Sequence, residues 1–152
     1  MEFRRASAKD GIGISTIEQT CFSDPWSYRS IEDLLCTEGS MCFVAVEDPN
    51  TERERVVAYF IGRLIPPEGE LYRIAVAPEY RKRGIGYRLM DYSVKTSLGR
   101  GLETLFLEVR SRNLAARRLY TSYGFREMGI RRGYYHDPED DAVIMMHTRY
   151  GV

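Results

Sequence analysis

The segment RIAVAPEYRKRGIGYRLM (residues 73–90) constrains the fold most, because it joins a strand to a helix through a basic, glycine-containing turn. A strand-like apolar run ends at Val76, and apolar residues recur at helical spacing over residues 85–98. A helix that begins at such a turn points unpaired N–H groups at whatever lies above it, and glycines allow close approach. The bases of RKRGIG (residues 81–86) add positive charge there. These features together indicate a site for a phosphate or pyrophosphate.

This turn matches neither of two better-known glycine loops. A Walker A loop needs Gly-Lys followed by Ser or Thr, and the dinucleotide fingerprint needs GxGxxG, whereas Gly86 is followed by YRLM. The alternative to an anion site is an ordinary strand-to-helix turn with surface bases. The hexamer alone does not decide between the two.

The length and charge of the chain limit its class. Its 152 residues fit one domain, predicted to span 1–152. The 22 Lys and Arg equal the 22 Asp and Glu, so the chain has no overall field toward nucleic acid or anionic membranes. No apolar run approaches the roughly 20 residues that span a bilayer, and MEFRRASAKDG lacks the apolar region of a signal peptide. We predict a soluble, cytoplasmic chain with no membrane partner and no direct nucleic-acid partner.

The cysteines and histidines offer no metal or nucleophile pattern. Cys21, Cys36 and Cys42 are odd in number and too far apart for a CxxC pair, so we expect buried free thiols and neither a disulfide framework nor a metal site. His136 and His147 lie far from any cysteine in sequence. A Cys–His nucleophile remains open but without support.

Apolar periodicity and turn residues predict alternating strands and helices in a mixed α/β sheet. The predicted strands are residues 2–6, 41–47, 55–65, 70–76, 104–110, 126–132 and 142–148, of which the second to fourth form an antiparallel meander. The predicted helices begin at Asp10, after Ser27 as N-cap, at Ile85 and after Asn113. The order is β-α-α-β-β-β-α-β-α-β-β, with a loop at 133–141.

Four blocks of the sequence resemble the GCN5-related N-acetyltransferase (GNAT) family. RKRGIG matches the signature R/Q-x-x-G-x-G/A, and it follows IAVAPEY as the fourth strand of that family precedes its pyrophosphate loop. The blocks LEVRSRNLAARRLYTSYGF, RRGYYHDPEDDAVIMM and CFSDPWS resemble those of bacterial ribosomal-protein-alanine N-acetyltransferases. The resemblance implies a GNAT-type α/β fold, with a mixed, mostly antiparallel central sheet flanked by helices.

The resemblance also implies acetyl-CoA as co-substrate, without a metal. The backbone of Ile74 and Val76 would pair with the pantetheine arm, and the Val76 N–H would polarise the acetyl carbonyl. Asn113 would hydrogen-bond the arm, and Tyr120 would contact the thiol end. The residues implied at the pyrophosphate are Arg81, Arg83, Gly84, Ile85 and Gly86. Arg73 departs from the pattern, since many relatives of this subgroup carry Asn there.

Glu108 is the candidate general base. An amine that attacks a thioester must lose a proton, and a carboxylate can accept it directly or through water. Strand alternation places Glu108 on the face opposite Leu107 and Val109. The alternative from residue chemistry is an exposed strand residue or an ion-pair partner of a nearby arginine, whereas the resemblance implies the base of the ribosomal-protein enzymes. Glu70, on the neighbouring strand, is a second candidate base.

Tyr120 is the candidate acid. It lies seven residues after Asn113, so both residues can face one side of a helix. A phenol with a reference pKa of about 10 can protonate a thiolate at neutral pH. The alternative is core packing beside Leu119 and Tyr123, and Asn113 also suits a plain N-cap. The resemblance implies the acid role for Tyr120.

Amine chemistry and two loops indicate the acceptor. An α-amine has a reference pKa of about 7.7 to 8.0 and lysine about 10.4, so one modest base favours a protein N-terminus over lysine. The resemblance implies that this N-terminus is the alanine of a small-subunit ribosomal protein. Aromatic and acidic side chains of the loops FSDPW (residues 22–26) and GYYHDPEDD (residues 133–141) can bind the end of a peptide. The alternative is that Trp26 packs in the core and that the acidic loop is solvated. The expected contacts are Phe22, Asp24, Trp26, Tyr134 and Tyr135.

Two other functions remain open. One is a GNAT enzyme that acetylates small amines or a broader set of protein N-termini. The other is a non-catalytic module that binds acetyl-CoA, or that binds RNA through the basic segments RSRNLAARR and GIRRGYY.

Overall fold

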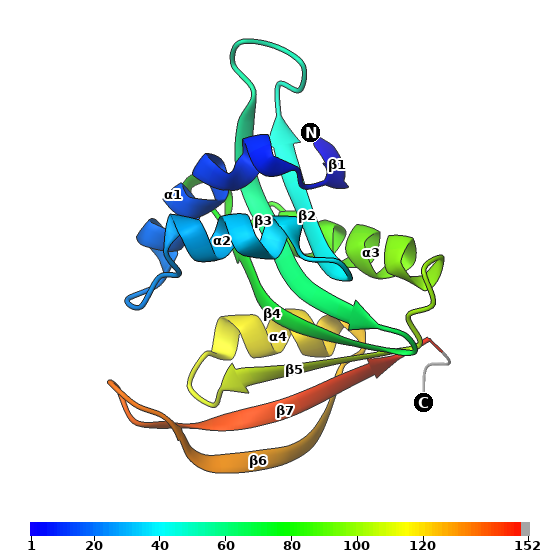
Figure 1. The fold of residues 1–152 in the computed structure, drawn as a ribbon. Coiled ribbons are helices and arrows are strands. Elements are labelled where there is room, and N and C mark those ends of the chain that lie inside the picture. Colours follow the sequence, from blue (N-terminus) through cyan, green and yellow to red (C-terminus); the bar gives the residue numbers. More distant parts are fainter. Residues whose placement is uncertain (150–152) are drawn as a thin grey trace.

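The computed structural model describes residues 1–149, and residues 150–152, with which the predicted domain ends, lie outside the described residues. Seven strands form one sheet in the order β1-β2-β3-β4-β5-β7-β6 (Figure 1). The strands are β1 (Glu2–Arg5), β2 (Ser40–Glu47), β3 (Arg55–Ile65), β4 (Glu68–Val76), β5 (Thr104–Arg110), β6 (Arg126–Tyr135) and β7 (Asp140–Thr148). The helices are α1 (Gly11–Cys21), α2 (Tyr28–Cys36), α3 (Ile85–Leu98) and α4 (Leu114–Tyr123), with 3-10 turns η1 (Ala8–Asp10) and η2 (Pro78–Tyr80).

The strand pairing confirms the predicted mixed, mostly antiparallel sheet and its element order. Within residues 1–149, only β4 and β5 pair in parallel, and β2, β3 and β4 form the expected antiparallel meander. The last hairpin corrects the prediction, because β6 continues to Tyr135, which pairs with Asp140 at the start of β7. The connecting loop is therefore residues 136–139 and not 133–141.

Helices cover both faces of the sheet (Figure 1). Tyr59 of β3 reaches Glu18 of α1, whereas the next residue, Phe60, packs with Phe43 against Tyr92 of α3. Since successive strand residues point to opposite faces, α1 and α3 lie on opposite sides. None of the helices in residues 1–149 is long and apolar enough to cross a membrane.

The helix ends follow their predicted signals. Ser27 caps α2 by accepting from the Ser30 N–H at 3.1 Å, and Asn113 caps α4 by accepting from the Ala116 N–H at 3.2 Å. Gly124 ends α4 in the left-handed conformation, with φ of 107°. These local signals confirm the predicted capping residues.

The predicted burial of the thiols is only partly correct. All three cysteines are free, but Cys42 alone is buried, Cys21 is half-buried and Cys36 is exposed. Cys36 is the last residue of α2 and is exposed to solvent. The expectation was therefore wrong for Cys36.

A fork between β4 and β5 is the feature of the fold that creates the site. These strands pair only from Glu68 with Thr104 to Leu71 with Leu107. Tyr72 then forms a bulge, since Gly62 pairs with Leu71 and Ile61 pairs with Arg73. A Cβ on Gly62 would lie 2.3 Å from the Glu70 carbonyl oxygen, so the bulge requires glycine at this position. Beyond it, β4 has a strand neighbour on one side only.

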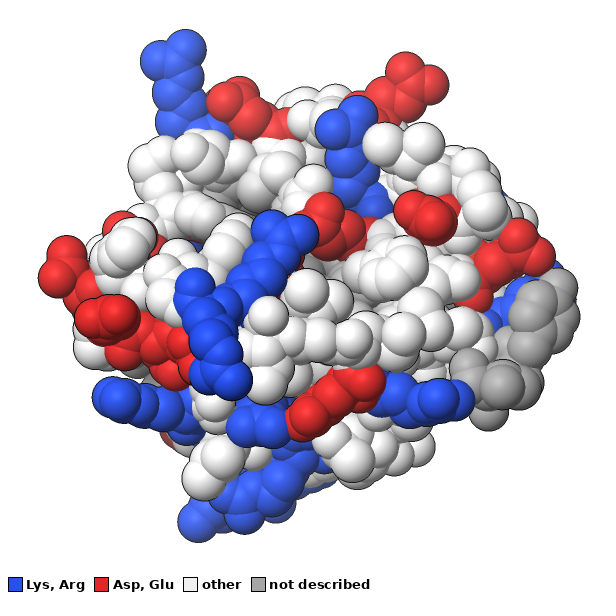
Figure 2. Space-filling view, turned by 90° about the horizontal axis from the view of Figure 1, so that it is seen from below, with Lys and Arg blue, Asp and Glu red and all other residues white. Residues whose placement is uncertain are grey.

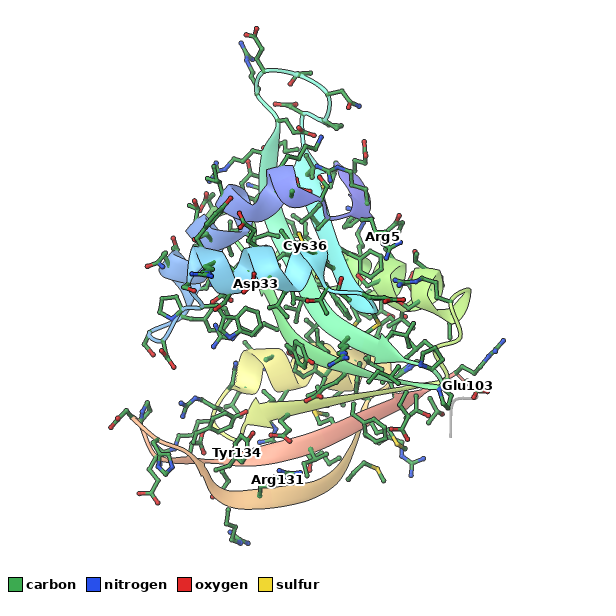
Figure 3. All side chains as sticks on the ribbon, in the orientation of Figure 1. Arg5, Asp33, Cys36, Glu103, Arg131 and Tyr134 are labelled. Carbon is green, nitrogen blue, oxygen red and sulfur yellow. The ribbon has the colours of Figure 1, made fainter. Side chains whose placement is uncertain are left out.

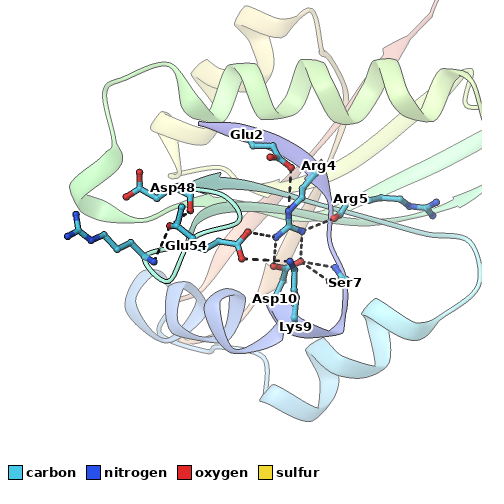
Figure 4. Close-up of polar contacts among 10 residues, drawn as sticks. Glu2, Arg4, Arg5, Ser7, Lys9, Asp10, Asp48 and Glu54 are labelled. Atoms are coloured by element: carbon cyan, nitrogen blue, oxygen red, sulfur yellow. Dashed lines mark hydrogen bonds and ion pairs between the residues drawn. The ribbon is translucent and has the colours of Figure 1, made fainter.

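A charged network ties the N-terminal strand to α1 (Figure 4). The Arg4 guanidinium donates to both Asp10 carboxylate oxygens at 2.8 and 2.9 Å and lies 3.5 Å from Glu54. The Ser7 N–H also donates to Asp10, at 2.8 Å. Burial acts to raise the pKa of the Asp10 carboxyl, but the hydrogen bonds from Arg4 and Ser7 outweigh it and lower this pKa.

Candidate active site

The first groove lies beside the fork, on the turn that was predicted to hold an anion. It has a volume of about 540 Å³ and lies between the end of β4, the start of α3 and the start of α4. Its lining includes the predicted cofactor residues Ile74, Val76, Arg81, Gly84, Ile85, Gly86 and Asn113. The structure thus brings seven of the predicted cofactor residues to one groove, which we call the cofactor groove.

The start of α3 gives this groove the properties of a phosphate cradle. Gly84 has a φ of 74°, and no atom lies within 4 Å of the position of a Cβ there. A Cβ on Gly86 would contact Leu119 and Val76 at 3.5 and 3.6 Å and so narrow the groove. The first N–H groups of a helix lack partners within the helix, and they attract anions. The residues present therefore fit the pyrophosphate of coenzyme A.

The basic residues of the turn have different surroundings. The Arg81 guanidinium donates from Nε to the Val76 carbonyl at 3.2 Å and lines the groove. The Arg83 guanidinium instead donates to the Glu79 carbonyl at 3.2 Å, lies 5.0 Å from the centre of the Tyr80 ring and does not line the groove. Lys82, which was predicted to add charge at this turn but was not among the predicted cofactor contacts, does line it. Its φ of 63°, rare for lysine, had no signal in the sequence.

The second groove runs along the paired part of β4 and β5 and has a volume of about 680 Å³. Glu70 and Glu108, the two candidate bases, both line it, together with the bulge residue Tyr72. A groove that presents carboxylates and aromatic side chains beside the cofactor groove suits an amine. We call it the acceptor groove.

Glu108 is held by two residues of β6, the strand at the lower edge of the sheet (Figure 3). Arg131 Nε lies 3.7 Å from Glu108 Oε1. A hydrogen bond from the Tyr134 hydroxyl to Glu108 raises the pKa of the Tyr134 phenol. As alternation predicted, Leu107 and Val109 are buried and Glu108 is only half-buried, so its carboxylate is both oriented and accessible.

Tyr120 lies buried behind the cofactor groove. Burial raises the pKa of its hydroxyl, and nearby Tyr135 adds to this shift. The ring packs 5.7 Å from that of Phe125. Tyr120 lines neither groove, although its helix neighbours Ala116 and Leu119 line the cofactor groove. Burial thus keeps this hydroxyl protonated, and its role as the acid stays a prediction.

The predicted acceptor residues come from two places. Phe22 lines the cofactor groove, Trp26 is half-buried, and Asp24 is exposed. Tyr134 and Tyr135 are neighbours on β6, with their rings perpendicular and 5.0 Å apart. Neither tyrosine lines the acceptor groove, but the Tyr134 hydroxyl reaches Glu108, which does.

A buried cluster around Glu18 was missed by sequence reasoning. The Glu18 carboxylate is fully buried and accepts hydrogen bonds from the Tyr59 hydroxyl, from the Trp26 N–H at 2.8 Å and from Arg73 Nη1 at 2.5 Å. Burial and the hydrogen bond to Glu18 raise the pKa of the Tyr59 phenol, which therefore stays a donor. The available signal was a carboxylate on the helix face shared by Ile14.

The bases that suggested RNA binding are largely paired within the molecule. Arg117 contacts Glu127 at 2.5 Å, and Arg132 lies 3.7 Å from Asp141. Arg110 donates to the carbonyl oxygen of Pro138 at 2.7 Å. In the view from below, basic and acidic side chains are interspersed and form no continuous basic surface (Figure 2).

Comparisons with known proteins agree with the geometry. The model of the acetyltransferase (GNAT) family matches residues 12–125. The chain belongs to the GNAT acetyltransferase family. It is 36% identical over 131 residues to the ribosomal protein bS18-alanine N-acetyltransferase of Escherichia coli strain K12, covering 85% of this chain and 84% of that protein. The corresponding enzyme of Haemophilus ducreyi is 33% identical over 132 residues, covering 85% and 87%.

A solved structure supports the same assignment. The crystal structure of the ribosomal-protein-S18-alanine N-acetyltransferase from Escherichia coli superposes with a TM-score of 0.86 at 32% identity, covering 97% of this chain and 92% of that one. The GNAT fold and family, predicted from four sequence blocks, are thus confirmed. The protein is an acetyl-CoA-dependent N-acetyltransferase, which excludes the non-catalytic alternative.

Proposed function

We propose that this acetyltransferase moves acetyl from acetyl-CoA to the N-terminal α-amine of a protein, and that its acceptor is the N-terminal alanine of ribosomal protein bS18. The similarity to bS18-alanine N-acetyltransferases along most of the chain supports this acceptor. The observation that carries the chemistry is the placement of Glu108 in a groove beside the cofactor groove, held by two residues of one strand.

Each residue in this proposal has one chemical task. Acetyl-CoA, when bound, supplies an activated acetyl thioester. Glu108 accepts the proton that the attacking amine must lose, while Arg131 and Tyr134 orient its carboxylate. The Val76 N–H polarises the acetyl carbonyl. Tyr120, kept protonated by burial, gives its proton to the departing sulfur.

In this proposal the acceptor peptide passes between the 22–26 loop and the tyrosines of β6, which lie outside the lining of the acceptor groove, and its α-amine reaches Glu108 in that groove. Asp24 is exposed on that loop and suits a basic side chain that follows the first residue. Asp24→Asn should therefore raise the KM for a basic peptide by about twofold to fivefold, the effect of one exposed charge pair. An unchanged KM would remove Asp24 from the acceptor site.

Mass spectrometry of a basic peptide that begins with alanine tests the proposed function. The peptide is incubated with acetyl-CoA and the protein, beside the same peptide with a blocked α-amine and unmodified lysines. We expect one acetyl group, on the free α-amine only. Acetyl on lysine, or on small amines but no peptide, would contradict the proposal.

A further inference from the structure

Arg73 lines neither groove, but its two neighbours in sequence line one groove each. It follows Tyr72, which lines the acceptor groove, and precedes Ile74, which lines the cofactor groove. It also sits immediately after the point where β4 separates from β5. A side chain at this position can affect the binding of either substrate by fixing the position of a neighbouring loop.

Arg73 holds the 22–26 loop. Its Nη1 contacts the buried Glu18 carboxylate at 2.5 Å, and its Nη2 donates to the Asp24 carbonyl at 3.3 Å. The guanidinium carbon lies 4.3 Å from the centre of the Phe22 ring and 4.4 Å from that of Trp26. Both distances are within the range of cation–π contacts. One side chain thus contacts three residues of the loop.

Glu18 makes this anchor rigid. Its carboxylate also accepts from Tyr59 of β3 and from the Trp26 N–H, so strand, helix and loop meet at one fully buried charge. A buried carboxylate that loses a partner is costly, which disfavours conformations in which Arg73 leaves it. The loop therefore keeps one position relative to β4.

We propose that Arg73 is a positioning residue for the acceptor: it fixes the 22–26 loop as a preformed wall of the acceptor site. This inference rests on the proposed function, because it concerns the peptide of that reaction. Arg73 contacts neither Glu108 nor Tyr120 in the described part of the chain. Its loss should therefore raise the KM for the peptide and leave kcat nearly unchanged.

The first test variant is Arg73→Met, with Arg73→Lys as the conservative change. Arg73→Met leaves Glu18 buried without its cation, so the double variant Glu18→Gln with Arg73→Met removes the anchor without leaving an unpaired charge. Arg55→Met is the matched control, because Arg55 also pairs with a carboxylate, Glu79, and lies 5.4 Å from a ring centre, that of Tyr80, but lines neither groove.

Two measurements are made on each variant. Trp26 is the only tryptophan of the chain, so acrylamide quenching of its fluorescence reports on the loop directly. Steady-state kinetics with the peptide that begins with alanine gives KM and kcat. We expect quenching to increase and the peptide KM to rise about tenfold in Arg73→Met and in the double variant, with an intermediate rise in Arg73→Lys and no change in Arg55→Met.

Two results would overturn the inference. Unchanged quenching in both Arg73→Met variants would show that Arg73 does not hold the loop, and increased quenching with an unchanged peptide KM would show that the loop is not a wall of the acceptor site. The proposed function fails on the wild-type protein alone, if it acetylates no peptide α-amine. In that case the claim that the loop is a wall of the acceptor site also fails. The quenching measurement still tests whether Arg73 holds the loop.

Discussion

The two grooves on either side of the fork are lined by different kinds of residue. The cofactor groove is lined by glycines, by mostly apolar side chains and by the cations Arg81 and Lys82, and no carboxylate of residues 1–149 lines it. The acceptor groove is lined by charges of both signs, among them Glu70, Glu108 and Arg131. Backbone groups recognise a phosphate chain in any sequence that folds this way, whereas side chains can change from one acceptor to another. We therefore expect a substitution in one groove to affect the substrate bound there and to leave the KM for the other substrate nearly unchanged.

The largest effect should come from Glu108→Gln. It keeps the shape and hydrogen bonds of the side chain but cannot accept the proton, so kcat should fall by about 100-fold or more while the KM for acetyl-CoA changes little. Steady-state kinetics with both substrates varied measures this. Glu70→Gln, in the same groove, is the matched control; full turnover in Glu108→Gln with loss in Glu70→Gln would move the base to Glu70.

Tyr120→Phe should lower kcat by about tenfold to a hundredfold, because it removes the proton donor but keeps the ring that packs on Phe125. Burial raises the pKa of Tyr120, so its hydroxyl stays protonated beyond its ordinary value of about 10. The ratio of wild-type to variant kcat should therefore stay constant between about pH 7 and pH 9. A ratio that falls with rising pH would show that Tyr120 ionises in this range.

The variants Lys82→Gln and Arg83→Gln test which cation of the turn contributes to binding of acetyl-CoA. Lys82 lines the cofactor groove and Arg83 does not, so the first change should raise the KM for acetyl-CoA about fivefold and the second by less than twofold. The KM for the peptide should stay constant in both. Equal effects of the two changes would mean that Arg83 turns toward the cofactor on binding.

The smallest effect on either groove should come from Asp10→Asn, in the network of Figure 4. It should lower the free energy of unfolding by about 1–2 kcal/mol at pH 7 and leave both KM values unchanged. Because the folded-state pKa of Asp10 is lowered, its contribution is present above the unfolded pKa of about 3.9 and is lost as the pH falls through the folded pKa. Urea denaturation should thus show the variant and wild type converging below about pH 4. A gap that persists in acid would assign the loss to packing.

Local signals were sufficient for one helix of the cofactor groove and for one strand of the acceptor groove. The helix at 85–98 was predicted with its observed bounds, since a glycine lies immediately before it and Gly99 follows it. The strand at 104–110 also matches, and its alternation placed Glu108 correctly on the face opposite Leu107. In these segments each residue's environment depends mainly on its neighbours in sequence.

The rest depends on contacts between distant segments. Glu18 meets Tyr59 and Arg73 across 41 and 55 residues, and no local pattern links them. The extension of β6 to Tyr135 is set by its pairing with Asp140 rather than by its own residues. Family resemblance supplied the catalytic candidates, but it treated Arg73 only as a departure and gave it no role.

The bulge at Tyr72 leaves the protein with an internal edge. Outer edges of sheets invite pairing with other chains, and proteins shield them by charge, bulges or short length. Here the unpaired edge of β4 faces the cofactor groove, which residues of α1 and α4 also line. Gly62 permits the bulge, because a Cβ at this position would collide with the Glu70 carbonyl. The glycine at position 62 thus permits the bulge after which one edge of β4 is free to pair with an extended ligand.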